Sequence, residues 1–160
     1  MLEVDVFTDL DCDACDEAER VLSDALRKFP IHTRGVIHLP SAEHRWSMQA
    51  AKAFDCAYED GQGSEMYQAL RKRRSEFARM SWDSLAKEVD VYDLEAFRRC
   101  MAGRTTPRIE AGLSLAKRLG LPAAPAVIVD GWLVYPVTLE ALTSALEEAR
   151  LKRNAAAYRW

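Results

Sequence analysis

Residues 2–22 read LEVDVFTDLDCDACDEAERVL. The first five of them alternate apolar and acidic side chains, which is typical of a β-strand with one buried face. Farther along, apolar side chains recur at helical spacing, so residues 13–28 are predicted to form an amphipathic helix. Cys12 and Cys15 stand at the junction between the two. The sequence thus places a C-x-x-C pair where a strand ends and a helix begins.

The following elements extend this start into a sheet. Pro30 ends the predicted helix, and residues 31–39 are expected to form a second strand, parallel to the first. Near the C-terminus, residues 126–129 and 132–135 are apolar runs around an Asp-Gly dipeptide, which is typical of a two-residue hairpin turn. These two strands are therefore predicted to be antiparallel. Together the four runs predict a mixed four-stranded sheet.

The middle of the chain has a different character. Residues 41–103 show no strand pattern and are predicted to be a helical insertion of about four helices. Their first turns are expected to be capped by Ser41, Ser64, Ser81 and Asp93. Another helix should begin after Thr106 and end at Gly120. A last helix is expected after Thr138, and residues 153–160 are expected to form a frayed tail.

Composition limits the classes of function. The 160 residues are 49% hydrophobic and 29% charged, which suits one globular domain, and the formal net charge is -3. An acidic chain has no overall attraction to nucleic acid or to anionic lipid, so neither partner is expected. The N-terminus lacks a signal-peptide pattern, and no apolar run is long enough to span a membrane. The sequence as written favours a cytoplasmic protein, or a periplasmic or secreted one if a leader was removed.

The cysteine pair carries the chemistry. A cysteine at a helix N-terminus, such as Cys12, has its thiolate stabilised by unpaired N–H groups and by the helix dipole. Cys15 lies one turn farther into the helix, within disulfide reach but more buried. This asymmetry predicts that Cys12 is the attacking thiol and Cys15 the resolving thiol.

Two segments far apart in the sequence identify a family. Residues 4–15 and residues 120–131, which read GLPAAPAVIVDG, together resemble the DsbA-like branch of the thioredoxin superfamily. The resemblance spans nearly the whole chain and includes the helical insertion. It implies an α/β thioredoxin-like fold built from residues 1–40 and 104–152, with residues 41–103 as the inserted helical subdomain.

The resemblance also implies an activity and a site. The family consists of thiol:disulfide oxidoreductases and isomerases that act on protein thiols and disulfides or on glutathione, and it needs no cofactor. Cys12 and Cys15 match its catalytic pair. Pro125 matches its cis-proline, which faces the cysteines and lets the backbone of the preceding residue, here Ala124, pair with a substrate strand. The oligomeric state is not implied.

The residues around the pair are predicted to tune its redox poise. Asp13 and Ala14 stand between the cysteines, where the family often has proline with histidine or an aromatic residue. Asp13, Asp11 and Asp16 each disfavour a further negative charge on sulfur. We therefore expect a weakly stabilised thiolate and a couple that resembles reductants more than strong oxidants.

Other interpretations remain open. The pair could be half of a metal site, with His38 and His44 as candidate further ligands, although no second C-x-x-C or H-x₃-H is present. A glutathione-dependent isomerase or transferase of the same fold is a second alternative, and the presence of Cys15 argues against it. A non-catalytic metal-binding or partner-binding module is a third.

The remaining conspicuous residues have structural explanations. Cys56 and Cys100 lie beside the apolar stripes of separate predicted helices and are expected to be unpaired, small apolar side chains. The basic run at residues 71–74 is interpreted as a solvated helix face rather than a nucleic-acid site. The tryptophans are expected to pack between elements: Trp46, Trp82 and Trp132.

Overall fold

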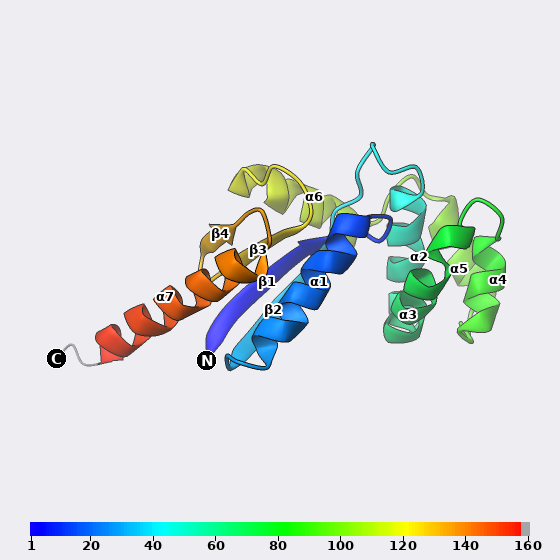
Figure 1. Ribbon diagram of the computed structural model, residues 1–160. Helices are drawn as coiled ribbons and strands as arrows, with labels where there is room; N and C mark the ends of the chain where they lie inside the picture. Colours follow the sequence, from blue (N-terminus) through cyan, green and yellow to red (C-terminus); the bar gives the residue numbers. More distant parts are fainter. Residues whose placement is uncertain (158–160) are drawn as a thin grey trace. The chain divides into compact units, whose positions relative to one another are not determined.

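The computed structural model describes residues 1–157 (Figure 1). Its elements follow the chain in this order: β1 (Leu2–Thr8), α1 (Asp13–Leu26), β2 (Ile31–His38), α2 (Ser47–Glu59), α3 (Gly63–Arg73), the 3₁₀ helix η1 (Arg74–Glu76), α4 (Trp82–Glu88), α5 (Leu94–Ala102), α6 (Pro107–Leu119), β3 (Ala126–Val129), β4 (Trp132–Val134) and α7 (Leu139–Ala157). The predicted α/β fold is confirmed, and α2 to α5 are the four helices expected in the middle of the chain.

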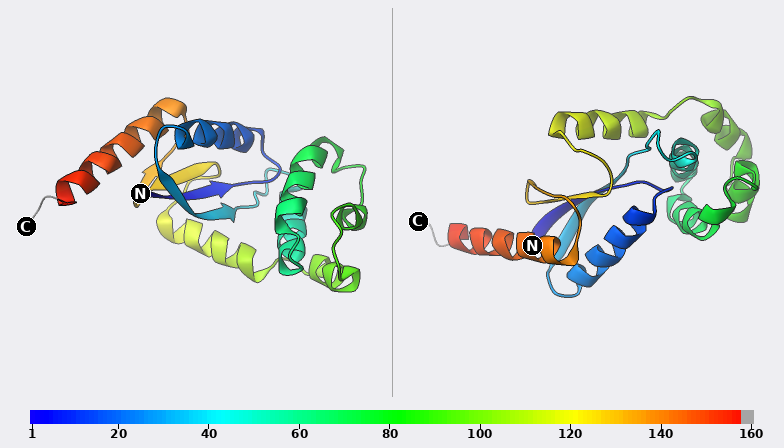
Figure 2. Two further views of the ribbon diagram at one scale, coloured as in Figure 1. Left: turned by 90° about the horizontal axis from the view of Figure 1, so that it is seen from below. Right: turned by 45° about the horizontal axis from the view of Figure 1, so that its top comes forward.

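The four strands form one mixed sheet in the order β2-β1-β3-β4. β1 and β2 run in the same direction (Figure 2), whereas β3 is antiparallel to both β1 and β4. In the register of β1 and β3, Val4 lies opposite Val129. Asp130 and Gly131 make the hairpin turn with φ angles of 46° and 88°. Two consecutive positive φ angles are what a type I′ turn needs, so the predicted hairpin is confirmed.

One face of this sheet is covered by α1 and α7. The buried cluster on that face takes its apolar side chains from β1, β3, β4 and the two helices, and it includes Leu2, Val4, Val6, Leu22, Val127, Val129, Leu142 and Leu146. The acidic residues that alternate with these in β1 point to the opposite face, where Glu3 and Asp5 both pair with Arg34 of β2. The alternation in the sequence therefore decides which face of β1 is buried.

The last helix is longer than expected. Residues 153–157 belong to α7, so the tail predicted there is wrong. Arg153 pairs with Asp130 of the hairpin turn and donates a hydrogen bond to the Met1 carbonyl at 2.6 Å. Three alanines then follow at 155–157, and alanine has the highest helix propensity. These two effects extend the helix, and the rest of the predicted tail, residues 158–160, lies outside the described residues.

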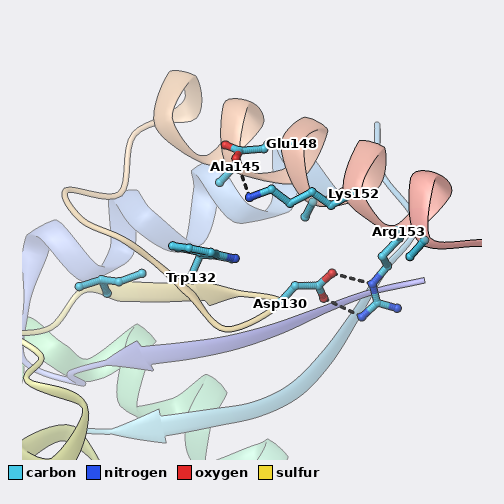
Figure 3. A pocket seen from close by; sticks show the side chains of 9 residues that line it. Asp130, Trp132, Ala145, Glu148, Lys152 and Arg153 are labelled. Atoms are coloured by element: carbon cyan, nitrogen blue, oxygen red, sulfur yellow. Dashed lines mark hydrogen bonds and ion pairs between the residues drawn. The ribbon is translucent and has the colours of Figure 1, made fainter. Parts of the chain in front are cut away.

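Next to this ion pair, β4 and α7 border a hollow of about 530 Å³ (Figure 3). The ammonium of Lys152 pairs with Glu148 and lies 4.7 Å from the centre of the Trp132 ring. Trp132 is 66% exposed. The packing role expected for this tryptophan is therefore wrong, because it lies on the outer strand of the sheet and is mostly exposed.

The helices α2 to α5 enclose a second apolar core. Its largest buried members are Met66, Leu70, Phe77, Leu85 and Phe97. Two of the four expected caps are confirmed, because the side chain of Ser81 accepts a hydrogen bond from the Ser84 amide and that of Asp93 accepts one from the Ala96 amide. Each such bond satisfies an N–H group that a helix start leaves without a partner.

The other two expected caps are displaced. α3 begins at Gly63, so Ser64 lies inside its first turn and is not its cap. α2 begins only at Ser47, because Ser41 instead accepts a local hydrogen bond from the Glu43 amide and forms a turn. Serine competes for nearby backbone groups in this way outside helices, which the periodicity of apolar residues does not reveal.

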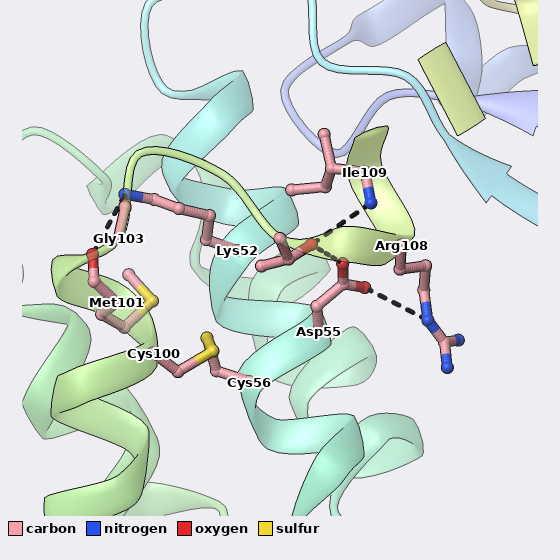
Figure 4. Close-up of a disulfide and its surroundings, with 9 residues drawn as sticks. Lys52, Asp55, Cys56, Cys100, Met101, Gly103, Arg108 and Ile109 are labelled. Carbon is pink, nitrogen blue, oxygen red and sulfur yellow. Dashed lines mark hydrogen bonds and ion pairs between the residues drawn. A yellow bond between two sulfur atoms is a disulfide. The ribbon is translucent and has the colours of Figure 1, made fainter. Parts of the chain in front are cut away.

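A disulfide joins Cys56 of α2 to Cys100 of α5 (Figure 4). The expectation that both are unpaired is wrong, because the two helices pack together and bring the Cα atoms to 5.8 Å, within the range that a disulfide requires. Beside it, the buried ammonium of Lys52 donates hydrogen bonds to the carbonyls of Met101 and Gly103 at 3.0 and 2.8 Å. The end of α5 is thus attached to α2 covalently and by hydrogen bonds.

Contacts divide the chain into two compact units. One contains Met1–Thr8, Asp13–Ile37 and the chain from Leu121 onward, and the other contains Asp9–Cys12 and His38–Gly120. The second unit, called the helical unit below, therefore holds α6 and the short loop before α1 as well as the four central helices. The narrower bounds inferred from the sequence stay a prediction.

Candidate active site

The C-x-x-C pair occupies the junction that the sequence predicts. β1 ends at Thr8 and α1 begins at Asp13, so Cys15 lies in the first turn of the helix. Both cysteines are buried, with 5% of Cys12 and 1% of Cys15 exposed. Both are disulfide-bonded, and none of the four cysteines is free.

The loop before Cys12 contains a buried acid. Asp9 is 4% exposed, and one of its carboxylate oxygens accepts hydrogen bonds from the Ser47 hydroxyl at 2.5 Å and from the Asp11 amide at 3.0 Å. The other oxygen lies 2.9 Å from Nδ1 of His44. A buried carboxylate is stable only with such partners. Asp9 therefore fixes the segment before α2 to the loop that carries Cys12.

A second contact reinforces this attachment. The carboxylate of Asp11 accepts a hydrogen bond from the Trp46 amide at 3.0 Å. The Ser41 amide donates to the Ser47 hydroxyl at 2.9 Å, which closes residues 41–47 into a compact turn. The carboxylates at positions 9 and 11 are thus acceptors for specific donors of this unit.

The same unit contributes two basic side chains to this region, His44 and Arg74. The hydrogen bond to Asp9 raises the pKa of His44 above its ordinary value, so this imidazole carries more positive charge near neutral pH. From the junction of α3 and η1, Nη1 of Arg74 donates a hydrogen bond to the Cys12 carbonyl at 3.0 Å. The expectation that residues 71–74 are only a solvated face is therefore wrong for Arg74. Helical periodicity could not show that the end of α3 reaches the cysteine loop.

His38 has a different environment from His44. It is the last residue of β2 and is buried against Phe54, whose ring centre lies 4.5 Å away, and against Tyr67 at 6.2 Å. Burial lowers its pKa to about 4, and its Nε2 is among the buried polar atoms that lack a hydrogen-bond partner in the described chain. His38 is thus a neutral side chain of an aromatic cluster at pH 7.

The other predicted site residues have the following places. Asp13 and Ala14 are exposed in the first turn of α1. Ala124 and Pro125 are half-buried immediately before β3, and the peptide bond between them is cis. The roles inferred for these four residues stay predictions.

The two histidines considered as metal ligands face different partners, His38 an aromatic cluster and His44 the Asp9 carboxylate. Within residues 1–157, no three histidine, cysteine, aspartate or glutamate side chains are grouped as metal ligands. None of the helices described there combines the length and hydrophobicity that crossing a membrane requires.

Comparison with known proteins identifies the family of this chain. Residues 2–148 match the model of a family described as thioredoxin. The chain belongs to the thioredoxin family. No curated protein matches its sequence.

Solved structures with the same fold include other members of the thioredoxin group. A thioredoxin-like oxidoreductase from Silicibacter pomeroyi DSS-3 is similar with a TM-score of 0.68 and 24% identity, over 94% of this chain and 87% of that one. The thiol-disulfide exchange protein alpha-DsbA2 from Wolbachia pipientis has a TM-score of 0.67 and 18% identity, over 92% and 81%. The oxidoreductase DsbA from Xylella fastidiosa has a TM-score of 0.67 and 16% identity, over 97% and 87%.

Sequence reasoning missed three residues around Cys12 in this thioredoxin-family chain. Asp9 has no pattern that distinguishes it from the other acids near Cys12, His44 is considered above only as a metal ligand, and Arg74 only as part of a solvated helix face. The contact of His44 with Asp9 joins positions 35 residues apart in the chain, and that of Arg74 with Cys12 joins positions 62 residues apart. The one available signal was Asp9 itself, an acid placed between the buried end of a strand and a cysteine.

Proposed function

We propose that this protein is a thiol:disulfide oxidoreductase that uses Cys12 and Cys15 to exchange disulfides with protein substrates. The observation that carries the proposal is a disulfide-bonded C-x-x-C pair at the start of α1 in a chain of the thioredoxin family. We take the two cysteines to be partners of one disulfide, because Cys56 and Cys100 are bonded to each other and no cysteine is free.

The reaction has two exchange steps. In the reductive direction, the Cys12 thiolate attacks a sulfur of the substrate disulfide and forms a mixed disulfide, while the other substrate sulfur leaves as a thiolate. The Cys15 thiolate then attacks the Cys12 sulfur, which closes the disulfide of the protein and releases the second substrate sulfur. Two electrons pass to the substrate, whose thiolates take up two protons. Reversal of the steps oxidises a substrate dithiol.

The roles of the two cysteines follow from their positions. Cys12 is the more exposed of the pair and precedes the first turn of α1, where the helix dipole favours a thiolate. Cys15 is 1% exposed and suits a thiol that reacts only with the adjacent mixed disulfide. Ala124 and Pro125 are proposed to hold the substrate strand, which rests on the resemblance to the DsbA-like family.

Thiol exchange of this kind uses cysteine sulfur alone, so we propose no cofactor and no metal. The structural neighbours named as a thiol-disulfide exchange protein and as DsbA support protein disulfides as substrates. The sequence favours a cytoplasmic location and leaves a periplasmic or secreted one as the alternative. Because the Cys56–Cys100 disulfide is more typical of an oxidising compartment, we propose the alternative location.

Reduction of insulin by the protein with a small dithiol as electron donor tests the proposal. We expect the wild-type chain to accelerate the reaction and Cys12→Ala to abolish the acceleration. The double variant Cys56→Ala/Cys100→Ala, measured at a temperature where it is folded, is the control and should remain active. Activity that depends on glutathione and survives Cys15→Ala would favour the glutathione-dependent alternative, and inactivity of the folded wild type would favour the non-catalytic module.

Trapping experiments test the order of the steps. With a disulfide substrate, Cys15→Ser should accumulate a mixed disulfide through Cys12, because nothing then resolves it. Cys12→Ser should accumulate none. Equal trapping by the two variants would contradict the assigned roles.

A further inference from the structure

We propose that Arg74 acts as a positioning residue of the redox site, and that its guanidinium stabilises the Cys12 thiolate from the helical unit. This inference rests on the proposed function and adds a residue to it. It begins from the hydrogen bond that Nη1 of Arg74 donates to the carbonyl oxygen of Cys12 at 3.0 Å.

That bond places the positive charge of the guanidinium close to Cys12. A carbonyl oxygen and the sulfur of the same cysteine are separated by four bonds, so Nη1 of Arg74 lies within about 8 Å of the sulfur. A guanidinium remains charged at every pH at which the protein is folded. Reduction of the pair creates a negative charge on Cys12, whereas the disulfide has none. The attraction therefore acts on the reduced form alone.

The other charged groups around Cys12 determine how strongly the Arg74 guanidinium affects its thiolate. The first turn of α1 carries Asp13 and Asp16, whose carboxylates oppose a thiolate at Cys12. In the loop before Cys12, Asp9 accepts hydrogen bonds from Ser47 and lies against His44, and Asp11 accepts one from the Trp46 amide. Donors of the helical unit thus offset part of the negative charge of this loop.

Arg74 has helical backbone on both sides. It follows the last turn of α3 and begins η1, and it is half-buried, unlike the exposed Arg71 and Lys72 earlier on the same helix. Phe77, three residues later, is buried in the core of the helical unit. The backbone that carries the guanidinium is therefore anchored next to a buried residue, so a small change of side chain can test its charge.

Three substitutions separate charge from hydrogen bonding. Arg74→Gln removes the charge but keeps an N–H donor for the Cys12 carbonyl, and Arg74→Lys keeps the charge. Lys72→Met is the matched control, because it removes one positive charge from an exposed position on α3. The rate of alkylation of Cys12 as a function of pH, followed by mass mapping, reports the pKa of its thiol in each reduced protein.

We expect Arg74→Gln to raise the pKa of the Cys12 thiol by about one unit, as loss of a charge at this distance predicts. Because the thiolate form of the reduced protein loses stability, the equilibrium with glutathione, measured at a pH above the Cys12 pKa, should shift several-fold toward the disulfide, and a tenfold shift equals about 30 mV. Arg74→Lys should keep the pKa of the Cys12 thiol and the glutathione equilibrium close to their wild-type values, and Lys72→Met should change neither. Thermal unfolding of each variant checks that the fold is retained.

The outcomes distinguish the two proposals. If the wild-type pair does not equilibrate with glutathione or reduce insulin, the proposed function fails. If the wild type does both and Arg74→Gln leaves the Cys12 pKa and the equilibrium unchanged, only the role of Arg74 is overturned. Equal effects of Arg74→Gln and Arg74→Lys would likewise overturn it, because they would point to packing rather than charge.

Discussion

Nδ1 of His44 lies 2.9 Å from Oδ2 of Asp9, although 35 positions separate the two residues in the sequence. The Asp9 carboxylate also accepts a hydrogen bond from the Ser47 hydroxyl. One buried acid therefore contacts two side chains from residues 44–47. This relationship fixes the cysteine loop to the segment before α2 within the same unit. It also sets the charge of a histidine near the redox pair.

Replacement of Asp9 tests that relationship. Asp9→Asn should lower the pKa of His44 toward its ordinary value of 6.5, because the hydrogen bond to the carboxylate is the main cause of the rise. The stability that this pair contributes is fully present below the unfolded pKa of the histidine and is lost as pH rises through the folded value. A titration of the imidazole by NMR measures the shift. Glu43→Gln is the control and should have a smaller effect, so equal shifts would contradict the assignment.

His38 should make the fold sensitive to acid. Its pKa is about 4 in the folded chain against 6.5 as the ordinary value, so between these values the unfolded chain binds a proton that the folded chain does not. The free energy of unfolding should therefore fall as pH drops from about 7 to 4, by about 3 kcal/mol in total from this group. Urea unfolding at a series of pH values measures it.

A neutral side chain at this position should remove the effect. His38→Leu keeps a similar volume among Phe54 and Tyr67 and cannot titrate, so its stability should change less over the same pH range. His32→Gln, at an exposed position of β2, is the matched control and should retain the full acid dependence. The same slope in His38→Leu and wild type would assign the acid sensitivity to other groups.

The second disulfide is expected to serve stability rather than exchange. Cys56→Ala/Cys100→Ala should lower the free energy of unfolding by about 2 to 4 kcal/mol, because the crosslink closes a loop with a sequence separation of 44. Chemical denaturation without reductant measures the loss. Cys12→Ala/Cys15→Ala provides the comparison, since a loop this short restricts the unfolded chain less and these two cysteines carry the proposed activity. Loss of insulin reduction in the folded first variant would show that the second disulfide takes part in exchange.

The carboxylate between the cysteines should oppose the thiolate. Asp13→Asn is expected to lower the pKa of the reduced Cys12 thiol by about half to one unit, allowing for solvent screening at this exposed position. The couple should become more oxidising, because the reduced form gains stability. Equilibration with glutathione buffers measures the potential. Asp24→Asn, on an exposed part of the same helix, should leave it unchanged, and a shift of Asp13→Asn toward more negative potentials would refute this electrostatic account.

The fold could be predicted from local patterns with physical meaning. The alternation in residues 2–6 specifies which face of β1 is buried, and the Asp-Gly dipeptide at 130–131 specifies the hairpin. Thr106 caps α6 through the Ile109 amide, and Gly120 ends it with a φ of 65°. Such signals act over a few residues, so a single sequence contains them in full.

The errors occurred where a distant residue overrides a local preference. Ser41 is a good capping residue, but it forms a turn because residues 41–47 fold against Asp9. Residues 153–157 remain helical because Arg153 pairs with Asp130 of the hairpin turn. Asp9 and Asp130 both lie far in the sequence from the segments whose structure they change.

The sequence by itself determined the sheet, the helices and the place of Cys12 and Cys15 between β1 and α1, because strand periodicity, capping and turn residues depend on near neighbours. Only the tertiary structure decided the pairing of Cys56 with Cys100 and the approach of His44 and Arg74 to the cysteine loop. Those contacts depend on how helices pack in three dimensions. The charge around Cys12 therefore depends on residues outside the motif as well as on Asp13 within it.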